Sequence, residues 1–131
     1  ELAEEINDSD IPVMIVRGNC DADIDAVMLK WPIANPYLVM WWNNKLILAS
    51  HGMDFERDRS LVLSFGADLM LMGHTHVCSF AREGRTIFLN PGSVGLPKGK
   101  DPASLALIDE EAISILSLDG MVFHQESWDL R

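Results

Sequence analysis

Apolar residues in this chain come in short runs of the length of a buried strand, such as residues 46–49. None of these runs approaches the roughly 18 residues that a membrane-spanning helix requires, so no membrane span is expected. Turn-forming Gly, Pro, Asn and Asp lie between most of the runs. Since 48% of the residues are hydrophobic, the chain can bury a core, and residues 1–131 are expected to form a single domain.

The order of the runs indicates an α/β fold. Strands are predicted at residues 12–17, 37–42, 45–50, 68–72, 77–82, 86–90, 104–109, 112–117 and 121–126. Helical spacing predicts helices at residues 1–6, 24–31 and 59–65. Helices alternate with the first strands and a strand meander follows, which predicts a mixed-sheet sandwich flanked by helices.

Two turns can be placed from residue type alone. Asn43-Asn44 lies between two predicted strands and suits a hairpin turn. Gly66 follows the predicted helix at residues 59–65 and suits its carboxyl-terminal cap.

The charge pattern narrows the class of partner. The net charge is −10, and the ten Lys and Arg residues are scattered along the chain. Binding to a nucleic-acid backbone requires clustered cations, so no such binding is expected.

The two cysteines, Cys20 and Cys78, form no CxxC pair, and no signal-peptide pattern precedes them. This usage is typical of reduced thiols in a cytoplasmic protein.

Polar residues with metal-binding side chains follow three of the predicted strands. Asn19 follows residues 12–17, His51 follows residues 45–50, and Gly73-His74-Thr75-His76 follows residues 68–72. α/β proteins place their sites on loops that leave the carboxyl ends of sheet strands. If residues 74–76 are extended, the two histidines point the same way and can converge on one metal or on two adjacent metals. An HxH pair alone is a weak signal, but the ordered combination is more specific.

That ordered combination resembles the later motifs of the calcineurin-like metallophosphoesterases. The segments that carry the resemblance are Gly18-Asn19-Cys20-Asp21, His51-Gly52, Gly73-His74-Thr75-His76 and Asn90-Pro91-Gly92-Ser93-Val94. Most of the superfamily has His where this chain has Cys20, whereas the YfcE-type phosphodiesterases have Cys. Pro97-Lys98-Gly99 and Pro102-Ala103-Ser104 also resemble that subgroup. The resemblance covers essentially the whole chain.

The resemblance implies hydrolysis of a small phosphodiester at a site with two divalent metal ions, with manganese as first choice and Zn, Fe, Ni or Co as alternatives. By motif position, Asn19, His51 and His74 would bind one ion and His76 the other. Imidazole nitrogen and amide oxygen suit such ions, and two ions can activate a water for in-line displacement. Cys20 and Asp21 are candidate catalytic residues; alternatively, Cys20 is a small buried residue without a role, and Asp21 serves a helix amino terminus.

The chain also departs from the family pattern, which includes an upstream Asp-x-His motif and a Gly-Asp motif. Neither occurs here. We therefore expect the domain to be amino-terminally incomplete, with its first strands missing, and to be a poor or inactive catalyst by itself. Exposed apolar sheet surface would favour association, either as a homo-oligomer or with the missing amino-terminal segment. Asn90-Pro91-Gly92-Ser93 is interpreted as a turn that supports the metal loops.

Two other functions stay open at this point. The retromer scaffold subunit resembles this family and serves as an interaction platform, so the chain could be a non-catalytic scaffold. The presence of Asn19, His51, His74 and His76 together favours catalysis. A domain that binds one metal through Asn19, His51 and His74 is the other alternative.

Overall fold

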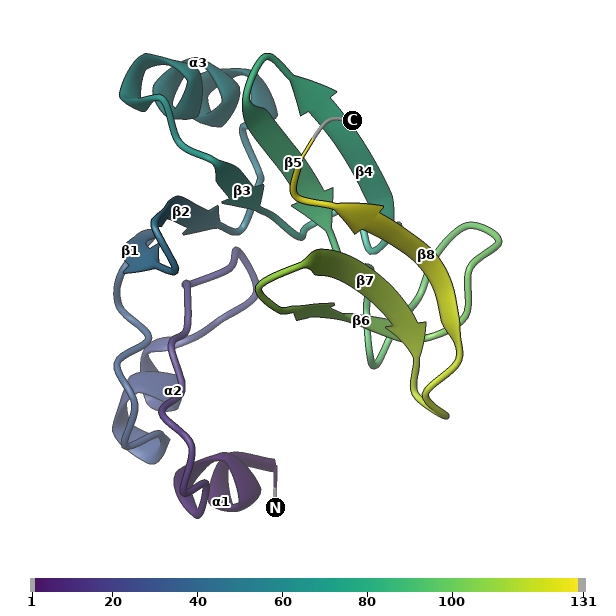
Figure 1. The fold of residues 1–131 in the computed structure, drawn as a ribbon. Helices are drawn as coiled ribbons and strands as arrows, with labels where there is room; N and C mark the ends of the chain where they lie inside the picture. Colours follow the sequence, from purple (N-terminus) through teal and green to yellow (C-terminus); the bar gives the residue numbers. More distant parts are fainter. Residues whose placement is uncertain (1, 130–131) are drawn as a thin grey trace.

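The computed structural model describes residues 2–129, which form two β-sheets and short helices (Figure 1). The helices are α1 (Leu2–Asn7), α2 (Asp23–Met28) and α3 (Phe55–Phe65). The strands are β1 (Tyr37–Trp42), β2 (Lys45–Ser50), β3 (Leu69–Leu71), β4 (Ser79–Glu83), β5 (Thr86–Asn90), β6 (Ser104–Ile108), β7 (Ala112–Ser117) and β8 (Val122–Ser127). No helix among residues 2–129 has the length and apolar character needed to cross a bilayer.

The larger sheet has the strand order β1-β2-β3-β5-β4. β2, β3 and β5 run parallel, while β1 and β4 pair antiparallel at the two edges. The smaller sheet, β6-β7-β8, is an antiparallel meander. The predicted α/β architecture with a mixed sheet is therefore confirmed, and the carboxyl ends of β2 and β3 lie side by side.

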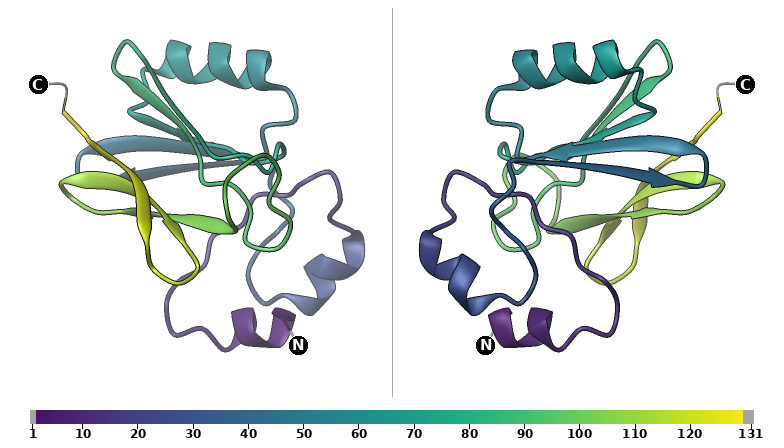
Figure 2. Two further views of the ribbon diagram at one scale, coloured as in Figure 1. Left: turned by 90° about the vertical axis from the view of Figure 1, so that its right-hand side faces the viewer. Right: turned by 90° about the vertical axis from the view of Figure 1, so that its left-hand side faces the viewer.

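Alternating side chains of the parallel strands build two separate cores, because successive residues of a strand point to opposite faces. One core joins the larger sheet to the smaller one and contains Ile47, Leu69, Ile87, Leu89, Ile113, Ile115 and Trp128. The other lies on the α3 side of the larger sheet and contains Leu48, Val62, Ala67, Met70 and Phe88. Figure 2 shows the resulting layers, with α3 over one face of the larger sheet and the smaller sheet beyond the other face.

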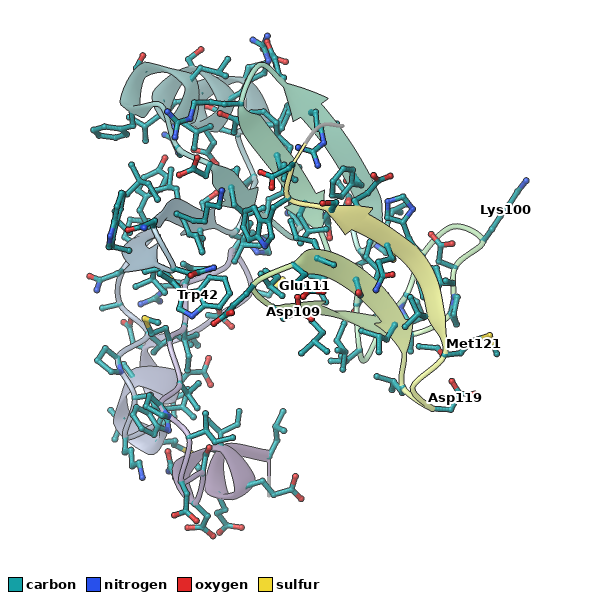
Figure 3. The ribbon with its side chains drawn as sticks, in the orientation of Figure 1. Trp42, Lys100, Asp109, Glu111, Asp119 and Met121 are labelled. Carbon is teal, nitrogen blue, oxygen red and sulfur yellow. The ribbon has the colours of Figure 1, made fainter. Side chains whose placement is uncertain are left out.

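Trp42 helps to join the two sheets at one end. Its ring lies 6.5 Å from that of Trp128, whose indole N–H donates to the Asp109 C=O at 2.8 Å. Figure 3 shows Trp42 directed toward the turn that carries Asp109 and Glu111. The same view shows the Lys100 side chain projecting away from the body of the molecule, on the loop between β5 and β6.

The local turn and cap signals have the expected geometry. Asn43 and Asn44 both have positive φ, 48° and 57°, in the turn between β1 and β2. Gly66 ends α3 in the left-handed conformation with φ 66°. α3 begins four residues before the predicted start at residue 59, because the Asp54 carboxylate caps it by accepting the Arg57 N–H. The strands from β1 to β8 agree with the predicted runs, with ends shifted by no more than two residues.

The predicted buried strand at residues 12–17 is wrong. These residues are not part of either sheet, and Met14 is 59% exposed. A strand requires a ladder of backbone hydrogen bonds. Within residues 2–129, this segment's backbone is held by one bond, from the Arg17 N–H to the Asn35 C=O. The run is apolar enough for a sheet but lies beside no paired strand.

The helix predicted at residues 24–31 ends early, at Met28. Asn7, at the end of α1, supplies the reason. Its side-chain amide donates to the Met28 C=O at 2.8 Å, and its side-chain oxygen accepts the Lys30 N–H at 2.7 Å. These bonds satisfy the backbone groups that another helical turn would otherwise use. The helix predicted at residues 1–6 is observed as α1, with Glu1 outside the described residues.

Candidate metal centre

Asn19, His51 and His74 come together at one end of the larger sheet. His51 Nε2 lies 2.7 Å from Asn19 Oδ1 and 3.1 Å from His74 Nδ1. The two imidazole rings meet edge to face, with centroids 5.0 Å apart. His51 directly follows β2, and His74 lies three residues after the end of β3. Because these strands are parallel neighbours, their ends deliver both rings to the same place.

Gly18 allows the Asn19 loop to approach His51 closely. A Cβ atom at Gly18 would lie 3.0 Å from His51 Nδ1, tighter than almost all ordinary contacts. The Asp21 carboxylate accepts the Gly18 N–H at 2.6 Å and so holds the loop in shape. The amino terminus of α2 is served instead by Asp25, which accepts the Ala22 N–H at 2.8 Å. Asp21 is therefore tied to the loop that carries Asn19.

The loop with His74 and His76 is not extended, so the predicted reason for their convergence is wrong. Both residues have left-handed backbone, with φ 69° at His74 and φ 60° at His76. The Thr75 N–H donates to the Gly73 C=O at 2.9 Å, which folds the loop tightly. Left-handed conformations cost free energy for residues with a Cβ, and they persist where surrounding contacts fix them.

Asn90 supplies those contacts from the end of β5. Its side chain is buried, and its amide donates to the Gly73 C=O at 2.9 Å and to Thr75 Oγ1 at 3.0 Å. Its side-chain oxygen accepts the Gly92 N–H at 3.0 Å. Asn90, at the start of the predicted turn at residues 90–93, therefore holds the loop that carries His74.

His76 and Cys20 lie at the margin of the cluster. His76 Nδ1 lies 2.8 Å from the Leu96 C=O, so this nitrogen carries the proton. Nε2 is then the nitrogen with a lone pair that is able to bind a metal ion. His76 is close enough for its charge to lower the pKa of His51. Cys20 is an exposed free thiol in the turn after Asn19. The alternative of a buried Cys20 is therefore wrong.

The electrostatic surroundings favour neutral imidazole at His51. Burial lowers the pKa of His51, and the nearby His74 lowers it further, while Asp21 acts in the opposite direction. Neutral imidazole is the form that binds metal ions.

The donor atoms fit part of one metal coordination sphere. Among residues 2–129, no group of three or more His, Cys, Asp and Glu side chains gathers in a metal-binding arrangement. The cluster consists of two imidazoles and one amide oxygen. Its donor separations of 2.7 and 3.1 Å resemble the spacing of about 3 Å between adjacent ligands of an octahedral ion with bonds of about 2.1 Å. These separations are compatible with three donors of one divalent ion.

Sequence reasoning missed Asp58, which is 2% exposed and lines the same cavity as Asn19 and His51. One carboxylate oxygen accepts the Ser50 hydroxyl and the other accepts the Tyr37 hydroxyl, each at 2.7 Å. Ser50 directly precedes His51, so this network fixes the strand end that presents the ring. An acid in the first turn of a helix is usually an exposed partner of the helix dipole, so the sequence carried no signal of burial.

Asp58 also lies in the wall of a cavity of about 320 Å³ that begins at Asn19 and His51. Arg17, Tyr37 and Arg57 contribute to the same wall. A second cavity, of about 530 Å³, is also lined by His51 and lies between the two sheets.

Comparison with known proteins places these observations in a family. Residues 1–112 match the profile of the calcineurin-like phosphoesterase superfamily domain. The chain is 33% identical over 119 residues to the phosphodiesterase YfcE of Escherichia coli K12, covering 91% of this chain and 64% of that protein. The chain thus spans less than two thirds of the length of this curated relative.

Solved structures support the same assignment. The structure of YfcE, a phosphoesterase from E. coli, superposes with a TM-score of 0.83 at 28% identity, covering 98% of this chain and 70% of that one. Vps29 of Entamoeba histolytica, solved with Zn²⁺, has a TM-score of 0.56 at 20% identity over 98% of this chain and 88% of that one, and shows the fold alone. The predicted fold is thereby confirmed. The chain belongs to the calcineurin-like phosphoesterase superfamily.

Proposed function

We propose that this chain carries part of the catalytic centre of a metal-dependent phosphodiesterase that hydrolyses small phosphodiesters with two divalent ions, manganese being the first choice. Asn19, His51 and His74 would hold one ion, and His76 would contribute to the other. The observation that carries the proposal is the contact of Asn19 Oδ1, His51 Nε2 and His74 Nδ1 at separations of 2.7 and 3.1 Å.

A divalent ion in this place would supply a Lewis acid that polarises phosphoryl oxygen and activates water. The protein's own part is to hold neutral donors in position. Asn90 fixes the His74 loop, and Asp58 fixes the end of β2 through Ser50. Asp21 holds the Asn19 loop through Gly18, and Cys20 lies exposed beside it, where its thiol could meet a leaving group. The free thiols Cys20 and Cys78 fit the proposed location in the cytoplasm.

Two measurements on one set of variants test the function. Titration calorimetry with Mn²⁺ measures metal binding, and release of 4-nitrophenol from bis(4-nitrophenyl) phosphate measures hydrolysis. We expect His74→Ala to weaken Mn²⁺ binding at least tenfold and to reduce hydrolysis further, because it removes a ligand. His124→Ala is the matched control, since His124 lies on β8 in the smaller sheet.

Unchanged hydrolysis in His74→Ala, or hydrolysis that survives exhaustive chelation, would rule out the proposed chemistry. Metal binding without hydrolysis would support the metal site and would match the expectation of a poor or inactive catalyst by itself. Failure to bind Mn²⁺, Zn²⁺, Fe²⁺, Ni²⁺ or Co²⁺ would favour the scaffold hypothesis instead.

A further inference from the structure

His51 lies between two cavities that differ in charge. The first, which we name the arginine cavity, is lined by Arg17, Asn19, Tyr37, His51, Arg57 and Asp58 among others. The second, between the sheets, is lined by His51, Gly73 and residues of β6, and no Lys or Arg of the described chain lines it. An anionic substrate that reaches His51 therefore meets cations on one side only.

The residues that line the arginine cavity include more cationic than anionic side chains, whereas the chain as a whole is acidic. The chain has a net charge of −10, which repels anions at long range. In the wall of the arginine cavity, two guanidinium groups lie with a single carboxylate, that of Asp58. Guanidinium groups bind carboxylate and phosphate through paired N–H donors. The cavity wall therefore suits an anion that enters beside the candidate metal ligands.

The two arginines differ in how far they are already engaged. Arg17 donates to the Asp21 C=O at 3.2 Å and to the Asp23 carboxylate at 3.0 Å. The Arg57 guanidinium has the carboxylates of Asp54 and Asp58 at 4.0 and 3.8 Å, both beyond hydrogen-bond length. Arg57 therefore keeps donors for a ligand, whereas Arg17 mainly shapes the Asn19 loop.

Arg57 is placed by groups that also place His51. Its guanidinium carbon lies 6.0 Å from the centre of the Tyr37 ring, within the range of a cation–π contact. The Tyr37 hydroxyl donates to Asp58, which also accepts the hydroxyl of Ser50, the residue before His51. One buried carboxylate thus links the arginine end of the cavity to the strand that carries the imidazole.

We propose that Arg57 binds a second anionic group of the substrate, a carboxylate or a phosphate, while the scissile phosphodiester lies at Asn19, His51 and His74. This proposal rests on the proposed phosphodiesterase function and narrows its substrate class. The preferred substrate is a phosphodiester in which one ester group carries a negative charge. The cavity of about 320 Å³ has room for a small ester group of this kind.

The test compares two substrates that differ in one charge. They are 4-nitrophenyl phenyl phosphate and the same diester with a carboxylate on its phenyl ring, both assayed with Mn²⁺. The measured quantity is the ratio of kcat/KM for the charged diester to kcat/KM for the uncharged one. We expect Arg57→Gln to lower this ratio about tenfold, the size of one charge-assisted hydrogen bond at an accessible site. Arg57→Lys should retain part of the ratio, because it keeps the charge and loses the paired donors.

Arg59→Gln is the matched control. Arg59 lies on the same helix, but it pairs with Glu83 on β4 and does not line the cavity. The kcat/KM ratio of the charged to the uncharged diester should be the same in Arg59→Gln as in the unmodified protein. A ratio unchanged in Arg57→Gln, or lowered equally in Arg59→Gln, would overturn the assignment of Arg57.

The two proposals can fail separately. If neither diester is hydrolysed, which is the result expected of a poor or inactive catalyst, calorimetric binding of both diesters in the presence of Mn²⁺ gives the same comparison. Tighter binding of the charged diester that is lost in Arg57→Gln would still support the anion site. Equal binding of the two diesters by the unmodified protein would refute it.

Discussion

His51 Nε2 lies 3.1 Å from His74 Nδ1, although 23 residues separate the two histidines in the sequence. The contact exists because β2 and β3 are parallel neighbours whose carboxyl ends lie together. The backbone beside each ring is held by a buried side chain. Asp58 accepts the hydroxyl of Ser50, the residue before His51, and Asn90 donates to the C=O of Gly73, the residue before His74. The pair is therefore held in place by the sheet and by two buried polar side chains.

Asn19→Ala should weaken Mn²⁺ binding about tenfold or more, because it removes the oxygen donor that lies 2.7 Å from His51 Nε2. Asn19 is exposed, so the free energy of unfolding should change by less than about 0.5 kcal/mol. Asn19→Asp keeps an oxygen donor and should retain most of the affinity. Asn35→Ala, at an exposed asparagine outside the cluster, is the control for titration calorimetry. Equal affinity in Asn19→Ala and Asn35→Ala would remove Asn19 from the proposed ligands.

Asn90→Ala should lower the free energy of unfolding by about 2 kcal/mol, because it leaves the Gly73 C=O and the Gly92 N–H without their buried partner. Mn²⁺ affinity should also fall, since the left-handed loop with His74 loses its support. Urea unfolding and calorimetry measure the two effects. Asn90→Asp keeps the oxygen that accepts the Gly92 N–H and loses the N–H groups that donate to the His74 loop. We therefore expect it to lower Mn²⁺ affinity more than it lowers the free energy of unfolding. Native affinity in both variants would contradict the proposed support of the loop.

Gly92→Ala should destabilise the protein by about 3 kcal/mol. The new Cβ would lie 2.3 Å from Ser104 Oγ and 2.7 Å from Cys78 Sγ, and the φ of 86° disfavours any residue with a Cβ. Gly95→Ala in the same loop is the matched control, because a Cβ there meets nothing within 4 Å. Thermal unfolding of both variants separates local crowding from a general effect of the loop. Similar melting temperatures for the two would show that the close approach at Gly92 is relieved at little cost.

The Asp68 carboxylate should make stability depend on pH in the acid range. Burial by itself raises the pKa of Asp68, but the Arg85 guanidinium and the Leu46 N–H outweigh it and lower the pKa below the ordinary value of 3.8. A folded pKa below the unfolded one means that this stabilisation is complete above the unfolded pKa and is lost as pH falls through the folded pKa. Asp68→Asn should therefore cost about 1–2 kcal/mol at pH 7, and much less at pH 2.

Urea unfolding at both pH values measures this difference, with Glu110→Gln as the control at an exposed acid. Part of the Asp68 effect should also weaken at high salt, because the Arg85 side chain is 68% exposed. A cost that stays the same at pH 7 and pH 2 would exclude the charged form as its source.

Local sequence patterns determined the elements whose cause lies within a few residues. Asn43-Asn44 and Gly66 take the positive φ values that their turns require, and the apolar runs from β1 to β8 form strands. The spacing of Asn19, His51 and His74 after apolar runs was enough to suggest a shared site. The motif order was also enough to indicate the family, because it depends on residue type at fixed places in the chain.

Only the tertiary structure decided what depends on distant partners. Residues 12–17 have the composition of a buried strand and still pair with neither sheet, because a strand is defined by its hydrogen-bonded neighbour. In the sequence, Asp58 resembles an exposed acid of a helix amino terminus. In the structure it is buried and accepts the hydroxyls of Tyr37 on β1 and Ser50 on β2. The loop with the left-handed His74 is held by Asn90, which lies 16 positions further along the chain. The sequence pattern reports the local conformational preference of a segment. Strand pairing and side-chain burial depend on contacts between distant residues, which form only when the chain is folded.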